Sequence, residues 1–110
     1  MWLVTSADRW PQPEQFERLV SFAAGLAEDL FRAGKLTDVA LDEGAPRPVR
    51  RVRDFESWLD ELALVQPRRA FRPGEAAALP ALRRKNVITF APDGAQGVAA
   101  HVDGRKTATA

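Results

Sequence analysis

One stretch of the sequence, residues 13–34, constrains the fold more than any other, because it combines a helical apolar pattern with signals at both ends. Pro13 suits the first turn of a helix, and Gly34 suits the position just after its end. At about 1.5 Å per residue, such a helix would cross a small domain. Its apolar residues recur every three or four positions and therefore predict one broad, core-facing stripe: Phe16, Leu19, Val20, Ala23, Ala24, Ala27, Leu30 and Phe31.

Composition limits the size and class of the protein. The chain has 110 residues, of which 45% are hydrophobic and 28% are charged, so we expect a single domain over residues 1–110. Sixteen basic and fifteen acidic residues give a net charge of +1, so no overall field attracts nucleic acid or an anionic membrane. The absence of cysteine excludes disulfides and fits a cytoplasmic location. No apolar run approaches the length of a membrane span.

Several short segments predict strands. Residues 49–52 follow Pro46 and Pro48 and can only form an edge strand, since proline lacks a backbone donor. Residues 98–102 predict a last strand, and residues 106–110 predict a frayed tail. Three segments are apolar on both faces, which is typical of the centre of a parallel sheet: residues 1–6, 36–41 and 86–91.

A second helix is predicted over residues 55–65, with Asp54 as its N-cap and Pro67 as its stop. Residues 67–85 predict a loop that includes a short helix, 75–82, interrupted by Pro80. The alternation of strands and helices predicts an α/β fold in which helices flank a mainly parallel sheet. Four residues are expected to face that sheet: Phe16, Leu30, Leu59 and Leu62.

Two segments carry a resemblance to a known family. The run PEQFERLVSFAAGLAEDLFRAGKLTDVAL, followed by VRRVRDFESWLDELALVQP, resembles the C-terminal half of the bacterial family called domain of unknown function fifty-eight. The resemblance covers residues 10–67 and implies a doubly wound, von Willebrand factor A-like fold. It also implies a longer, often membrane-tethered protein that is encoded beside a MoxR-type AAA ATPase and assists assembly. Because this chain has neither a membrane segment nor the upstream half, we expect a truncated or free-standing relative.

The resemblance also implies where a functional centre would lie. In von Willebrand A domains an Asp-x-Ser-x-Ser loop after the first strand binds magnesium. Here Ser6 keeps the middle serine, Val4 replaces the first aspartate, and Asp8 stands in place of the last serine. Asp93 follows a predicted strand and is expected nearby, since loops gather at the carboxyl ends of strands in such sheets. Valine offers no oxygen ligand, so we expect no cofactor and disfavour magnesium.

Simpler interpretations and other functions stay open. Asp8 and Asp93 also fit ordinary turn residues. A small enzyme could use Ser6, Asp8, Asp93 or the single histidine, His101, although no serine or carboxylate stands near His101 in the sequence. Nucleotide binding is disfavoured because the segment 94–97 precedes a strand, whereas a phosphate-binding loop precedes a helix.

Three arginine-rich clusters predict a further alternative, a nucleic-acid or acidic-partner binder. Nucleic acid is disfavoured because acidic residues balance the arginines and few aromatic residues lie among them. Our leading hypothesis is a non-enzymatic protein-interaction or assembly domain that works with a MoxR-type AAA ATPase. We further expect a homodimer, formed through an unpaired strand at residues 98–102. The clusters are Arg47, Arg50, Arg51 and Arg53; Arg68, Arg69 and Arg72; and Arg83, Arg84 and Lys85.

Overall fold

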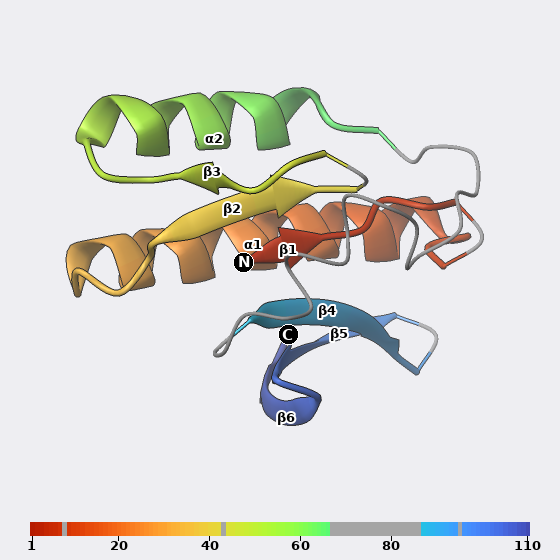
Figure 1. Cartoon of the computed structure of the whole chain (residues 1–110). Coiled ribbons are helices and arrows are strands. Elements are labelled where there is room, and N and C mark those ends of the chain that lie inside the picture. Colours follow the sequence, from red (N-terminus) through yellow and green to blue (C-terminus); the bar gives the residue numbers. More distant parts are fainter. Residues whose placement is uncertain (8, 43, 67–86, 95) are drawn as a thin grey trace.

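A computed structural model describes residues 1–7, 9–42, 44–66, 87–94 and 96–110, and every structural statement below concerns these ranges. The predicted short helix at 75–82 lies outside them. The described residues form two helices and two small sheets, whose arrangement can be followed in Figure 1. Along the chain the elements are β1 (Trp2–Leu3), α1 (Pro13–Arg32), β2 (Asp38–Leu41), β3 (Arg47–Pro48), α2 (Val52–Leu64), β4 (Ile88–Asp93), β5 (Gly97–Val102) and β6 (Arg105–Thr109).

The long helix α1 confirms the prediction made from its apolar stripe. Pro13 occupies its first turn, and Gly34 follows its end with a φ of 70°, a conformation that glycine adopts without strain. Phe16, Leu19, Ala23 and Ala27 are buried along one face. Leu30 is only half-buried, so it lies at the rim of that face and not at its centre.

The second helix, α2, begins earlier than the sequence predicted. Its N-cap is Arg51, and Asp54 lies in the first turn. The Asp54 carboxylate nevertheless caps this end, because it accepts hydrogen bonds from the backbone N–H groups of Arg50 and Arg51, both at 3.1 Å. Leu62 is buried as expected, whereas Leu59 is half-buried.

The first sheet has the order β1-β2-β3. β1 pairs in parallel with β2, with Trp2 opposite Ala40, and β3 pairs antiparallel to β2. The strands are shorter than predicted, and the edge strand lies at Arg47–Pro48, before the predicted segment 49–52. The predicted edge strand at 49–52 is therefore wrong in its position, because residues 49–51 form no strand and Val52 begins α2.

The second sheet is an antiparallel meander, β4-β5-β6, and it contradicts the predicted fold class. We expected the segment 86–91 to join a mainly parallel, doubly wound, von Willebrand A-like sheet, and this prediction is wrong. The chain reverses sharply after β4, so that Asp93 lies opposite Gly97 and local hairpin pairing replaces a crossover. Only glycine fits at position 97, because an added Cβ would lie 2.4 Å from the Asp93 carbonyl oxygen.

The last two strands correct two further expectations. Residues 98–102 form the central strand β5, which is paired on both sides, so they present no free edge. The expected frayed tail is the strand β6, which ends the meander.

The helix α1 joins the two sheets into one core. In Figure 1 it runs behind β1 and β2, with β4 and β5 below. Leu3 and Val39 from the first sheet share an apolar cluster with Phe90 and Val98 from the second. The ring of Phe22 on α1 also meets that of Phe90 edge-on, with centroids 5.8 Å apart. The opposite face of β1 and β2 carries a separate cluster, made of Trp2, Val4, Ala40 and Val87.

Candidate functional site

The most concentrated polar arrangement in the core lies where β1 and β2 end. Thr5 follows β1 and Asp42 follows β2, and the parallel pairing brings them together. One carboxylate oxygen of Asp42 accepts the Thr5 backbone N–H, and the other accepts the Thr5 hydroxyl, both at 2.6 Å. The Asp42 backbone N–H donates to the carbonyl of Leu3 at 2.8 Å, which extends the pairing of the strands.

The surroundings of Asp42 shield its contact with Thr5 from solvent. The residue is fully buried, with 0% exposure, and its φ of 51° is left-handed, a conformation that aspartate tolerates better than most residues. The indole N–H of Trp2 donates to its carbonyl at 2.9 Å, and that of Trp10 donates to Val4 at 2.8 Å. A buried hydroxyl that donates to a buried carboxylate has no access to substrate. We therefore interpret Thr5 and Asp42 as a clamp between strand ends.

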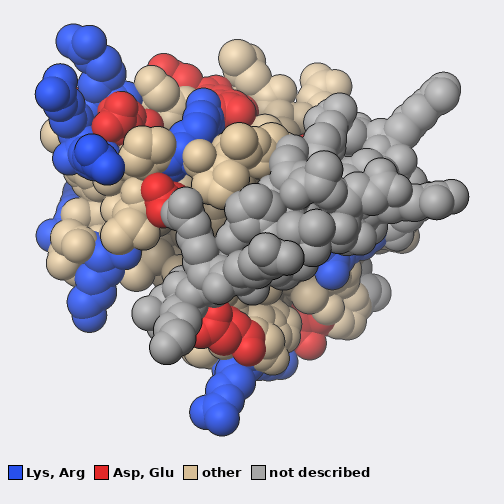
Figure 2. Space-filling model, in the orientation of Figure 1, with Lys and Arg blue, Asp and Glu red and all other residues tan. Residues whose placement is uncertain are grey.

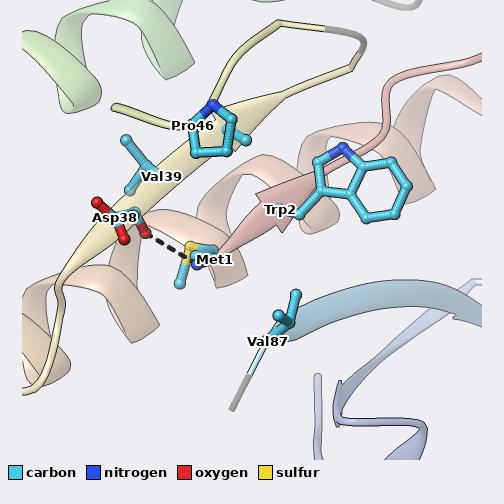
Figure 3. A pocket seen from close by; sticks show the side chains of 7 residues that line it. Met1, Trp2, Asp38, Val39, Pro46 and Val87 are labelled. Atoms are coloured by element: carbon cyan, nitrogen blue, oxygen red, sulfur yellow. Dashed lines mark hydrogen bonds between the residues drawn. The ribbon is translucent and has the colours of Figure 1, made fainter. Parts of the chain in front are cut away.

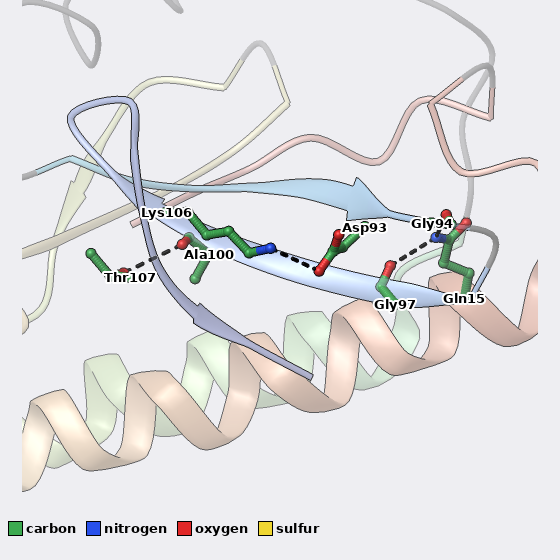
Figure 4. Close-up of polar contacts among 7 residues, drawn as sticks. All are labelled: Gln15, Asp93, Gly94, Gly97, Ala100, Lys106 and Thr107. Atoms are coloured by element: carbon green, nitrogen blue, oxygen red, sulfur yellow. Dashed lines mark hydrogen bonds and ion pairs between the residues drawn. The ribbon is translucent and has the colours of Figure 1, made fainter.

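The two predicted site residues that the structure describes, Ser6 and Asp93, each have other partners. Ser6 is buried, and its carbonyl accepts the backbone N–H groups of Arg9 and Trp10, as in a turn. Asp93 is exposed and pairs with Lys106 at 3.1 Å (Figure 4). Neither a hydrogen bond nor an ion pair links Ser6 to Asp93, and Asp8 lies outside the described residues.

The structure also shows where Val4 and His101 lie and whether the described side chains could hold a metal ion. Val4, which replaces the first aspartate of the adhesion motif, packs in the apolar cluster with Trp2 and Ala40. Within the described ranges, no three or more His, Cys, Asp or Glu side chains form a group that could hold a metal ion. His101 lies in β5, half-buried, opposite Thr89 and Lys106.

Sequence reasoning also missed the most buried polar side chain of α1. Gln15 is 3% exposed, and its amide N–H₂ group donates to the carbonyls of Gly94 at 3.1 Å and Gly97 at 2.8 Å (Figure 4). It thereby fixes the turn between β4 and β5 to the first turn of α1. The signal was its spacing, since Gln15 stands four residues before Leu19 on the apolar stripe.

The surface between the two helices is the larger recess. Apolar side chains of Phe16, Val20, Leu62 and Val65 line it, with Glu17 and Gln66 among its polar residues. Leu64 lies beside it in the sequence and is 82% exposed, which is unusual for a large apolar side chain near an apolar recess. A second, smaller hollow lies between Trp2, Pro46 and Val87 (Figure 3). There the amino group of Met1 donates to the carbonyl of Asp38 at 2.9 Å.

The beginning of α2 is basic. Arg50, Arg51 and Arg53 are exposed, and we call these three residues the basic patch. Figure 2 shows lysine and arginine side chains gathered at the left of the molecule, the end where α2 begins and α1 finishes, with acidic side chains among them. The hydrogen bonds from the backbone of Arg50 and Arg51, followed by the charges of Arg51 and Arg53, hold the pKa of Asp54 below its ordinary value.

Comparison of the chain with protein-family models, curated proteins and solved structures found no match. Neither helix in the described part of the chain combines the length and the apolar character that crossing a membrane requires.

Proposed function

We propose that this chain is a non-enzymatic, cytoplasmic protein-interaction or assembly domain. The observation that carries the proposal is the exposed Leu64 at the end of α2, whose sequence neighbours Ala63 and Val65 line the recess between α1 and α2. Exposed apolar surface next to a recess is typical of places where another protein docks. The polar residues that could have carried chemistry offer less support for an enzyme, because Thr5 and Asp42 are buried against each other.

A MoxR-type AAA ATPase is the partner that we propose. The support is the resemblance of residues 10–67, which contain α1, α2 and the recess between them. No cofactor is needed for such a role. The contact would use the end of α2, where Leu64 leaves the packed face of the helix.

The test is a binding titration between the purified chain and a purified MoxR-type AAA ATPase from the same organism. Leu64→Asp should weaken binding about tenfold or more, because a charge would replace a buried apolar contact. Since Leu64 is exposed, the substitution should leave the fold intact, which circular dichroism would check. Gln96→Asp is the matched control, since Gln96 is exposed between β4 and β5, in the other sheet. Absence of binding, or equal loss in both variants, would overturn the proposal.

A further inference from the structure

The arginines of the basic patch form no ion pair among the described residues, unlike two other arginines of the molecule. Arg47 forms an ion pair with Glu61, and Arg32 pairs with Glu28 at 2.6 Å. None of the three patch arginines takes part in an ion pair of the described residues. Their guanidinium groups are therefore available to groups outside the chain.

The backbone that carries the patch is held in place. The Asp54 carboxylate accepts the N–H groups of Arg50 and Arg51, so the chain before α2 is fixed by its own cap. The ring of Phe55 stacks on that of Phe31, with centroids 4.6 Å apart, which places the end of α1 beside the beginning of α2. A fixed backbone loses less conformational entropy when a ligand binds, so the patch is preorganised.

Three features of the patch identify the ligand. Guanidinium groups bind carboxylates through paired hydrogen bonds, which favours an acidic ligand. Val52 stands between Arg51 and Arg53 and is 59% exposed, so an apolar side chain of the ligand would find a contact within the patch.

The third feature of the patch argues against nucleic acid as its ligand. The neighbouring aromatic rings, Phe31 and Phe55, stack on each other and so are not free to stack on bases.

We propose that the basic patch, together with Val52, binds an acidic peptide segment that carries an apolar side chain and belongs to a partner protein. This inference rests on the proposed function, since it assigns a second contact to the same interaction domain. The peptide's carboxylates would pair with the arginines, and its apolar side chain would cover Val52.

The experiment is a fluorescence-anisotropy titration of the full chain with a labelled peptide of glutamates around one leucine. Arg50→Ala combined with Arg53→Ala should weaken binding about tenfold, and rising salt should weaken it further. Val52→Asp should weaken it as well, because the new carboxylate repels the peptide. Arg9→Ala combined with Arg105→Ala is the matched control, since both are exposed arginines outside the patch and should leave the affinity unchanged.

Each outcome decides the inference. Absence of peptide binding, equal loss in the control, or tighter binding of labelled single-stranded DNA than of the peptide would overturn it. The two proposals fail separately. Loss of ATPase binding in Leu64→Asp without peptide binding would leave only the proposed function, whereas patch-dependent peptide binding without ATPase binding would leave only the acidic-peptide site.

Discussion

Asp42 is the residue whose replacement should cost the most among the polar side chains of the core. Asp42→Ala would leave the Thr5 N–H and hydroxyl buried without their acceptor and would place alanine at a φ of 51°. We expect the free energy of unfolding to fall by about 3 kcal/mol, since each buried unsatisfied donor carries a desolvation penalty. Chemical denaturation followed by circular dichroism measures the change.

Asp103→Ala is the control for this substitution. Asp103 has the same φ of 51° but lies exposed between β5 and β6, and its carboxylate accepts the Val87 N–H at 3.0 Å, so the variant reports the cost of the backbone conformation and of exposed polar contacts without burial. A loss in Asp42→Ala no larger than that in Asp103→Ala would show that the clamp contributes nothing to stability.

Asp54 gives the beginning of α2 a dependence on pH. Its pKa is lower in the folded protein than its ordinary value of 3.8, so its contribution is present above that value. It is lost as the pH falls through the lowered folded pKa, because protonation removes the charge that accepts the two N–H groups. We expect hydrogen exchange at the first turn of α2 to rise over that acid range in the native chain. Asp54→Asn should remove the rise, and an unchanged rise would assign it to another group.

The binding residues Ser6, Asp8 and Asp93 stay a prediction, which came from the resemblance to a motif and from the position of these residues after predicted strands. Ser6 and Asp93 do follow strands, as expected, but β4 belongs to a different sheet from β1. Thr5 and Asp42 could have been found from a parallel pairing of residues 1–6 with 36–41, since Thr5 lies near the end of the first segment and Asp42 directly follows the second. The left-handed conformation of Asp42 could not be predicted, because the turn that requires it depends on where β3 begins.

At the scale of elements, Gln15 couples the meander to α1. Gln15→Glu would place a carboxylate against the carbonyl oxygens of Gly94 and Gly97, where it can only repel them. We expect the turn between β4 and β5 to detach from α1 and its amide hydrogens to exchange faster, by about tenfold or more. Gln15→Met fills similar space without charge and should raise exchange less. Equal protection in the glutamate variant and the native chain would contradict the coupling.

The helices were more predictable than the sheets for a physical reason. An apolar stripe of period 3.6 fixes both the existence and the buried face of α1, whereas apolar residues on both faces fix only the burial of a strand. In the structure, only Phe90 is buried among the described residues 87–91 of the segment 86–91, and residues 88–91 pair with β5 in a hairpin whose turn lies between Asp93 and Gly97. Pro92, Asp93 and Gly94 favour a turn, and so short a connection can join antiparallel strands but not parallel ones.

At the scale of the whole molecule, the homodimer stays a prediction, but the strand expected to mediate it is now a different one. The central position of residues 98–102 removes the edge first assigned to it, and β6 now forms the outer edge of the meander. We expect light scattering behind size exclusion at micromolar concentrations to show self-association. Thr109→Lys should reduce it, because a charge on an edge strand opposes pairing with a second copy. A single 12.1 kDa species at every concentration would contradict the dimer.

The contact between Phe22 and Phe90 has a consequence for how the protein is synthesised. Phe22 leaves the ribosome well before Phe90, so one side of α1 stays bare until β4 and β5 have been made. Apolar surface of this kind is what chaperones recognise on nascent chains. Ribosome-bound chains halted after residue 66, the end of the described segment that contains α2, should therefore crosslink to a chaperone more strongly than chains halted after release of β6. Equal crosslinking would show that the bare helix is not recognised.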